Sequence, residues 1–305
     1  MPDRALLIAL DWGTSNLRAS LLGAGGAVLD RRSAAGGVMA VPERRFEDAL
    51  RALCGDWIDA HRCPLVASGM IGSRQGWVEV PYLDAPATLQ AAAARLQPVP
   101  LAGGALLHIV PGLLCTGPDG QADVMRGEET QLWGADLAAG EVCVLPGTHS
   151  KWAWMGAGAA IDRFQTYMTG ELYAVLVQHS ILGRLMSPGT SRPQALADGA
   201  RLGLAEHAHL THLVFAARTA GLTGRRRGDE LPDFLSGLLI GAEIGSARRR
   251  GAPAAVTLLG EAALCERYAL ALQLAGMAVR PAPADATTRG QWRVAVAAGL
   301  VKEDA

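Results

Sequence analysis

The sequence predicts an α/β protein in which two halves repeat one layered plan. Short apolar runs that suit buried strands alternate with helical segments, an order that favours a layered α/β fold. An apolar strand, a Gly-Thr turn and a returning strand occur near the start of each half, at residues 6–22 and 142–155. The chain of 305 residues is long enough for two domains. We therefore expect a duplicated fold, with residues 1–118 and 119–305 as its domains.

The opening hairpin carries groups that suit a phosphate chain. Residues 6–10 form a short apolar run, and Asp11 ends it with a carboxylate. The turn that follows contains Gly13, Thr14 and Ser15, and the chain returns through apolar residues that flank Arg18. Backbone N–H groups and hydroxyls can bind phosphate oxygens, and a carboxylate can hold Mg²⁺ through water. An ordinary turn uses the same residue types, so the pattern alone leaves both interpretations open.

The apolar pattern of the rest of the chain predicts the other strands and helices of this fold. Apolar residues of the segment 46–61 fall on one helical face, between a third strand at 27–32 and a fourth at 65–67. Residues 116–120 are dense in Gly, Pro and Asp and mark the expected domain boundary. We expect further strands at 106–110, 142–145, 161–167, 255–259 and 277–281 and further helices at 89–96, 172–178, 193–206, 210–220, 232–249 and 288–301, with another that ends at 275.

A glycine-rich loop at residues 68–81 follows the fourth strand, where open α/β sheets bind their ligands. Arg74 offers a planar fork suited to a carboxylate, Gln75 a neutral hydrogen-bonding group and Trp77 a flat wall. The alternative is a solvent loop in which Arg74 pairs with Glu79.

Two adjacent carboxylates open the second half. Glu128 and Glu129 follow Gly127 at the predicted start of a helix. Acidic side chains in a first helical turn are stabilised by the helix dipole, which alone accounts for the pair. A catalytic base for a hydroxyl group is the functional alternative.

The second hairpin supplies further candidate ligands. Its turn and returning strand hold possible phosphate-binding residues, namely Gly147, Thr148, His149, Ser150 and Lys151. Tyr167 and Glu171 belong to a polar and aromatic cluster that suits the lining of a sugar-acid pocket. Gly260 lies between a strand and a helix. His149 and Lys151 also suit ordinary positions in a surface turn.

The expected helix 232–249 has glycine at every fourth position along one face, at 237, 241 and 245. Each such glycine costs about 1 kcal/mol relative to alanine, so this face predicts a very close approach of another backbone. The partner is either a helix at a hinge between domains or one within the same domain.

Composition excludes several classes of partner. A net charge of -1 gives no general attraction to nucleic acid or to an acidic membrane. Five scattered cysteines without a C-x-x-C pair indicate reduced thiols and a cytoplasmic protein. The apolar run 5–10 is too short for a signal peptide or a membrane span.

The loops together resemble one family. The opening Asp-x-Gly-Thr/Ser pattern resembles the first phosphate loop of the actin–hexokinase superfamily. The whole chain resembles the 2-dehydro-3-deoxygalactonokinase family through Asp11–Arg18, Gly69–Trp77, Met125–Gln131, Leu145–Trp152, Tyr167–Tyr173 and Leu235–Gly241. This resemblance implies two ribonuclease-H-like (actin/hexokinase-type) domains with an ATP cleft between them. It further implies ATP-dependent phosphorylation of the 6-hydroxyl of 2-dehydro-3-deoxy-D-galactonate, a small sugar acid of galactonate catabolism.

The resemblance also implies roles for the residues. Asp11 holds Mg²⁺, because Pro146 stands where the second loop of the superfamily often has Asp. The two Gly-Thr turns bind the ATP phosphates, Gly260 belongs to the adenosine loop, and Glu128 or Glu129 is the base. Glu261 replaces the usual second Gly or Ser of that loop. Another sugar kinase, or a non-catalytic actin-like regulator, is the alternative, and a homodimer is possible.

Overall fold

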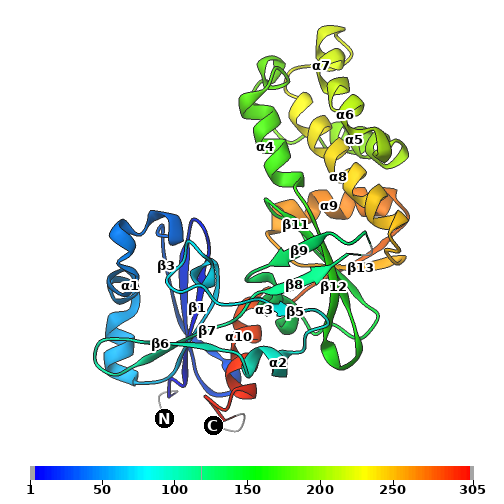
Figure 1. Ribbon diagram of the computed structural model, residues 1–305. Helices are drawn as coiled ribbons and strands as arrows, with labels where there is room; N and C mark the ends of the chain where they lie inside the picture. The colour runs from blue at the N-terminus through cyan, green and yellow to red at the C-terminus, as the bar shows by residue number, and fades with distance from the viewer. Residues whose placement is uncertain (1–3, 118, 303–305) are drawn as a thin grey trace. The chain divides into compact units, whose positions relative to one another are not determined.

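The computed structural model describes residues 4–117 and 119–302 and forms two compact units (Figure 1). Unit 1 contains the chain up to Gly140, Met155–Phe164 and the chain from Pro283, and unit 2 contains Glu141–Trp154 and Gln165–Ala282. These bounds differ from the predicted division after residue 118, which itself lies outside the described residues. The two units group residues by their contacts, whereas the division into residues 1–118 and 119–305 concerns the duplicated domains and stays a prediction.

Unit 1 is built on a six-stranded sheet of order β3-β2-β1-β4-β7-β6. β1 pairs antiparallel with β2 and parallel with β4, and β4 pairs parallel with β7. A smaller sheet has the order β5-β8-β9. The strands are β1 Leu7–Trp12, β2 Leu17–Leu22, β3 Val28–Ala34, β4 Leu65–Gly69, β5 Leu83–Asp84, β6 Gln97–Pro100, β7 Leu106–Ile109, β8 Leu113–Thr116 and β9 Ala122–Met125.

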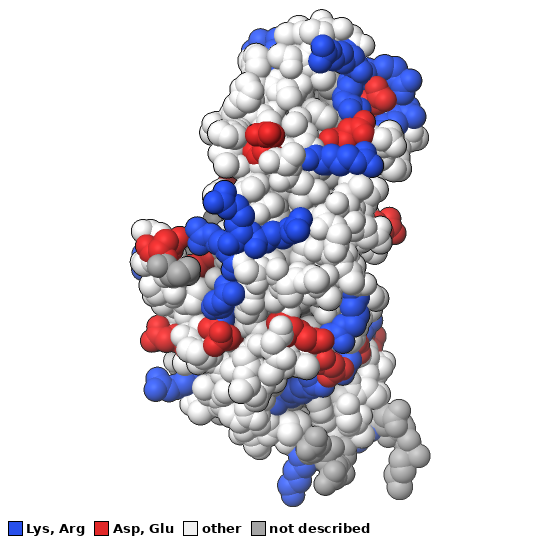
Figure 2. Space-filling model, turned by 90° about the vertical axis from the view of Figure 1, so that its right-hand side faces the viewer, with Lys and Arg blue, Asp and Glu red and all other residues white. Residues whose placement is uncertain are grey.

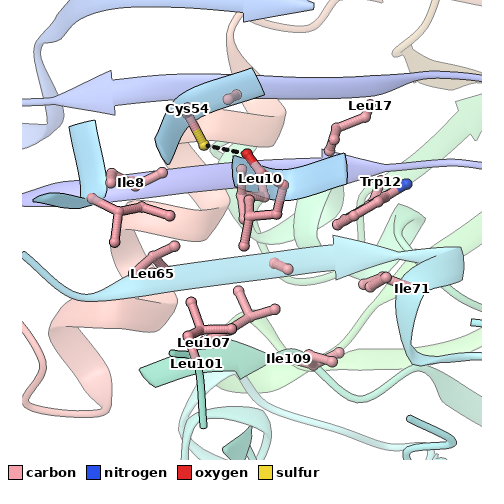
Figure 3. Close-up of a cluster of buried hydrophobic side chains, with 14 of the residues drawn as sticks. Ile8, Leu10, Trp12, Leu17, Cys54, Leu65, Ile71, Leu101, Leu107 and Ile109 are labelled. Atoms are coloured by element: carbon pink, nitrogen blue, oxygen red, sulfur yellow. Dashed lines mark hydrogen bonds between the residues drawn. The ribbon is translucent and has the colours of Figure 1, made fainter. Parts of the chain in front are cut away.

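The core of unit 1 lies between this sheet and α1, Phe46–His61 (Figure 3). Side chains from β1, β4 and β7 are fully buried there, among them Ile8, Leu65 and Leu107. The Cys54 thiol of α1 donates to the Leu50 carbonyl at 3.5 Å. The remaining helices of the unit are α2 Leu89–Ala93, α3 Glu128–Gly134 and α10 Ala286–Ala297, and α10 packs on β1, β4 and α3.

Unit 2 is built on a five-stranded sheet of order β12-β11-β10-β13-β14, of which only Met155 and the Ile161–Phe164 part of β12 are assigned to unit 1. β10 pairs antiparallel with β11 and parallel with β13, and β13 pairs parallel with β14. The strands are β10 Val142–Leu145, β11 Ser150–Met155, β12 Ile161–Tyr167, β13 Ala255–Leu258 and β14 Ala278–Pro281. The helices are α4 Thr169–His179, α5 Pro193–Ala205, α6 Leu210–Leu213, α7 Phe215–Leu222, α8 Leu231–Arg249 and α9 Ala262–Leu274.

The two sheets share one strand order. In unit 1 the order β3-β2-β1 is followed by β4 and β7, and in unit 2 the order β12-β11-β10 is followed by β13 and β14. In both sheets the last two of these strands run parallel to the hairpin's first strand, β1 or β10. The predicted class, α/β with two ribonuclease-H-like sheets, is therefore confirmed. The sequence missed β5, β6, β8 and β9, because runs of two to four residues give no usable periodicity. The helix expected at 210–220 is divided into α6 and α7.

The glycine face of α8 makes the close contact that the sequence predicted. A Cβ atom at Gly237 would lie 2.0 Å from the Leu196 carbonyl oxygen, and one at Gly241 would lie 2.3 Å from that of Ala200. Both partners belong to α5, which is in the same unit. The hinge interpretation of this face is therefore wrong, since the glycines serve packing inside unit 2.

The molecular surface carries both signs of charge on the face drawn in Figure 2, in keeping with the net charge of -1. No helix in the described part of the chain has the length and apolar character needed to cross a membrane. All five cysteines are free thiols.

Candidate active site

The first Gly-Thr turn is an exposed hairpin tip held by its own backbone. The Gly13 N–H donates to the Asn16 carbonyl at 2.9 Å, and the Gly13 carbonyl accepts from the Val38 N–H at 3.0 Å. Thr14 and Ser15 at the tip are exposed. The turn thus has a fixed shape and offers its hydroxyls to solvent.

Asp11 stands at the end of β1 beside this turn. Its carboxylate pairs with Arg18 of β2 at 3.1 Å. Burial raises the pKa of the Asp11 carboxyl above its ordinary value, Arg18 opposes that shift, and the charge of Glu128 adds to it. Asp11 and Glu128 are therefore close enough for their charges to interact.

The sheet brings these two carboxylates together. β1 and β4 are parallel, so their carboxyl ends lie at one edge, with Trp12 opposite Gly69. Gly127, which precedes α3, has φ +111°, and a Cβ atom there would lie 3.1 Å from the Gly69 Cα. A glycine at 127 thus allows α3 to begin against the end of β4. Gln291 of α10 holds the same edge by donating to the Leu10 carbonyl at 2.6 Å.

The two adjacent glutamates occupy different environments. Glu129 is 0% exposed, and its carboxylate oxygens accept from the Gly127 N–H at 2.9 and 2.7 Å. Burial, followed by the charge of Glu128, raises the pKa of Glu129 to about 7. Glu128 is only partly buried and accepts from the Arg126 N–H at 3.0 Å. Of the two side chains, only Glu128 is accessible from solvent.

The glycine-rich loop after β4 has two kinds of side chain. Trp77 stacks on Phe46 of α1, with ring centroids 6.0 Å apart, and packs against the core of unit 1. The Arg74 side chain is 83% exposed and its Nε lies 3.4 Å from Glu79. Gln75 is also exposed. The Arg74–Glu79 pair expected of a solvent loop is thus present. Trp77 mainly packs against the core of unit 1.

The second Gly-Thr turn is docked on the first turn of α4. The Thr148 carbonyl accepts from the Glu171 N–H at 2.9 Å, and His149 Nε2 lies 2.5 Å from Glu171 Oε2. A Cβ atom at Gly170 would lie 2.4 Å from the Gly147 carbonyl oxygen. The loop and the predicted pocket residue Glu171 therefore form one packed group. The other members of the second loop, Ser150 and Lys151, are buried in β11.

Behind this loop lies a buried carboxylate that the sequence reasoning missed. Glu243 of α8 is 3% exposed and accepts hydrogen bonds from Ser150 Oγ at 2.7 Å and Trp152 Nε1 at 2.8 Å. It also accepts from Tyr268 Oη at 2.7 Å and from the Thr169 hydroxyl. One side chain thus links β11, α4 and α9. An isolated acidic residue within an apolar, glycine-rich helix was the signal that could have revealed it.

Unit 2 contains a pocket of about 270 Å³ beside this network. Its lining includes Gly147, Thr169, Tyr173, Ser236, Arg267 and Tyr268. Gly260 lies close by in the fold, since a Cβ atom there would be 3.2 Å from the Pro146 carbonyl oxygen. Glu261 caps α9 by accepting the N–H groups of residues 263 and 264, both at 3.0 Å. The Tyr167 hydroxyl instead points toward α8, 3.4 Å from Ser246 Oγ.

The duplicated sheets, each with a Gly-Thr hairpin after its first strand, define an actin/hexokinase-type protein. The sequence profile of the 2-keto-3-deoxy-galactonokinase family matches residues 11–294. The chain therefore belongs to the 2-keto-3-deoxy-galactonokinase family.

Individual relatives agree with this assignment. The chain is 38% identical to the 2-dehydro-3-deoxygalactonokinase of Escherichia coli (strain K12) over 283 residues, covering 92% of this chain and 94% of that protein. A crystal structure from Sinorhizobium meliloti, of a protein with a provisional 2-dehydro-3-deoxygalactonokinase assignment, matches with a TM-score of 0.85 and 34% identity, covering 95% and 98% of the two chains. A xylulose kinase from Lactobacillus acidophilus shares the fold, with a TM-score of 0.51, 9% identity and coverage of 97% and 90%.

Proposed function

We propose that this protein transfers the γ-phosphate of ATP to the 6-hydroxyl of 2-dehydro-3-deoxy-D-galactonate. The products are ADP and 2-dehydro-3-deoxy-6-phosphogalactonate, an intermediate of galactonate catabolism in the cytoplasm. Family membership over residues 11–294 is the observation that carries this proposal. The carboxylates of Asp11 on β1 and Glu128 on α3, whose charges interact, support it, because a kinase needs one for a metal and one for a hydroxyl proton.

We assign nucleotide binding to both hairpins. Gly13, Thr14, Ser15 and Arg18 in unit 1, and Gly147, Thr148 and His149 in unit 2, would bind phosphate oxygens through N–H, hydroxyl and cationic groups. Ser150 and Lys151 are buried, so we expect them to support the second loop from behind. Gly260 and the pocket of unit 2 would accept the nucleoside.

Asp11 is our candidate ligand for Mg²⁺. A partly buried carboxylate at a strand end suits this hard cation. Within residues 4–117 and 119–302, no group of three His, Cys, Asp or Glu side chains could hold a metal by itself. The ion would thus take its other ligands from phosphate and water, and it would neutralise charge on the transferred group. Arg18 would release Asp11 for that role, since the Arg18 side chain is exposed and can turn into solvent.

Glu128 is our candidate for the base, because it is partly exposed and electrostatically coupled to Asp11. Its carboxylate would take the proton of the 6-hydroxyl while that oxygen bonds to the γ-phosphorus. The bond from phosphorus to the β-phosphate oxygen breaks, and ADP leaves. Glu129, fully buried, would position Glu128 by fixing the Gly127 N–H.

The sugar acid would bind beside these groups. Arg74 and Gln75 of the exposed loop, and Glu171 beside the second hairpin, remain our candidates for direct contact. Trp77 and Tyr167 would act through packing, because they contact Phe46 and α8 respectively.

A coupled assay of ADP release tests the proposal. Purified protein with MgATP is offered 2-dehydro-3-deoxygalactonate, its gluconate epimer and neutral hexoses. We expect strong turnover with the galactonate compound. A preference for the epimer would change the pathway but keep the kinase, and turnover of neutral sugars only would contradict an acid-binding site. No turnover together with measurable ATP binding would indicate an actin-like regulator.

A further inference from the structure

Arg126 is a half-buried cation with two buried N–H-bearing nitrogens that make no hydrogen bond to the described residues. It follows β9 and directly precedes Gly127 and the two glutamates. Its Nη2 donates to the Val80 carbonyl at 2.7 Å. Its Nε and Nη1 are buried and have no hydrogen-bond partner in the described part of the chain. Buried polar groups are normally paired, so these two donors require an explanation.

The surroundings of this guanidinium suit an anion. Among the described residues, no carboxylate forms an ion pair with Arg126, although its charge lowers the pKa of Glu129 somewhat against the larger effect of burial. The guanidinium carbon lies 4.3 Å from the centre of the Tyr82 ring. The positive charge is therefore held in place by a carbonyl and an aromatic face, neither of which neutralises it.

The glycine-rich loop is shaped around this side chain. A Cβ atom at Gly72 would lie 2.9 Å from Arg126 Nη1, so a larger residue would displace the guanidinium. The Val80 N–H in turn donates to the Gly72 carbonyl at 2.9 Å. The loop in which the sequence suggested Arg74 as the carboxylate ligand thus lies against a second arginine, which is more fully desolvated.

We propose that Arg126 is the specificity-determining residue that binds the carboxylate of the sugar acid. This inference rests on the proposed function and deepens it. A carboxylate can accept from Nη1 and from a second guanidinium nitrogen, the paired geometry that arginine favours. Binding would require the Tyr82 ring, which is 40% exposed and lies over the guanidinium, to move aside and admit the carboxylate. Arg74, exposed and beside Glu79, gains far less from the same contact, because water screens it.

The test separates charge recognition from a structural role. Wild type, Arg126→Gln, Arg126→Lys and Arg74→Gln are assayed with 2-dehydro-3-deoxygalactonate and with its carboxamide, which keeps the 6-hydroxyl but has no charge. Arg95→Gln, at an exposed arginine, is the matched control. We expect Arg126→Gln to lower kcat/KM for the acid by about 100-fold and for the carboxamide by less than about threefold. Arg126→Lys should keep a preference for the acid.

Several outcomes would overturn the inference. Equal losses on acid and carboxamide would mean that Arg126 only clamps the loop. A selective loss of the acid in Arg74→Gln, with Arg126→Gln unaffected, would assign the carboxylate to Arg74. If Arg126→Gln does not fold, Arg126→Lys provides the test. An Arg126→Lys variant whose kcat/KM is equal for acid and carboxamide would contradict the inference. Wild type without activity on either compound would instead refute the proposed function.

Discussion

Replacing Glu243 tests whether one carboxylate holds unit 2 together. This side chain accepts four hydrogen bonds from β11, α4 and α9. In Glu243→Ala, the hydroxyls of Ser150, Thr169 and Tyr268 can rotate toward one another, but the indole N–H of Trp152 cannot. In Glu243→Gln, the amide oxygen still accepts from two donors and its NH₂ group can donate to hydroxyl oxygens. The alanine variant should therefore be much less stable than the glutamine variant.

The magnitude follows from the groups that lose a partner. A buried donor without a partner costs about 1–3 kcal/mol, and each methylene removed from a packed interior costs about 0.8 kcal/mol. Weakened contacts among the hydroxyls add to this cost. We expect these losses together to lower the free energy of unfolding of Glu243→Ala by about 3–5 kcal/mol. For Glu243→Gln we expect about 1 kcal/mol.

Urea unfolding followed by tryptophan fluorescence measures both values, because Trp152 itself belongs to the network. Glu266→Ala, at an exposed position on α9, is the control for a lost charge on the same helix. The KM for ATP should rise in Glu243→Gln, since the second hairpin and the pocket share this anchor. The reasoning is refuted if the alanine and glutamine variants differ from wild type by less than about 0.5 kcal/mol, within the range of ordinary surface changes.

Three further predictions concern the site and the packing. Asp11→Asn should impair the use of MgATP, whereas Glu128→Gln should keep nucleotide binding and lower kcat by at least about 100-fold. Coupled assays measure kcat, and ATP titrations measure binding. A kcat near the wild-type value in both variants would make the site assignment wrong. Burial raises the pKa of Glu129 from 4.5 to about 7, so its stabilising contribution is present below pH 4.5 and lost as the pH rises toward 7. Glu129→Gln should thus be more stable than wild type at pH 8 by up to roughly 3 kcal/mol in urea unfolding, with no such gain at pH 4.5. Gly237→Ala would place a Cβ atom 2.0 Å from a backbone oxygen of α5, and it should lower the free energy of unfolding by about 1–3 kcal/mol or more. Gly36 has open space around it, so Gly36→Ala is the control and should have a melting temperature close to that of wild type.

Local patterns in the sequence were sufficient for much of the fold. The helix at 46–61 was predicted with the bounds that α1 has, because one apolar face and a following proline define it. The hairpins at β1–β2 and β10–β11 were predicted because glycine turns between apolar runs are local signals. The family, too, could be named from six loop motifs, which the profile match over residues 11–294 confirms.

The environments of individual site residues depended on contacts between distant segments. The sequence places Glu128 and Glu129 side by side, but the position of α3, which packs mainly on α10, buries Glu129 and leaves Glu128 partly accessible. Trp77 is a packing residue because α1 places Phe46 against it.

The sequence by itself determined most of the helices, the strands that carry the two hairpins and the family. Tertiary structure decided which segments come into contact. It places α5 against the glycine face of α8, donors from three separate segments around Glu243, and the glycine-rich loop against Arg126. The physical reason is that hydrogen bonding and turn preference act over a few residues, whereas burial depends on every segment that packs nearby. Desolvation, and with it the chemistry of a carboxylate or a guanidinium, is therefore fixed only in the folded chain.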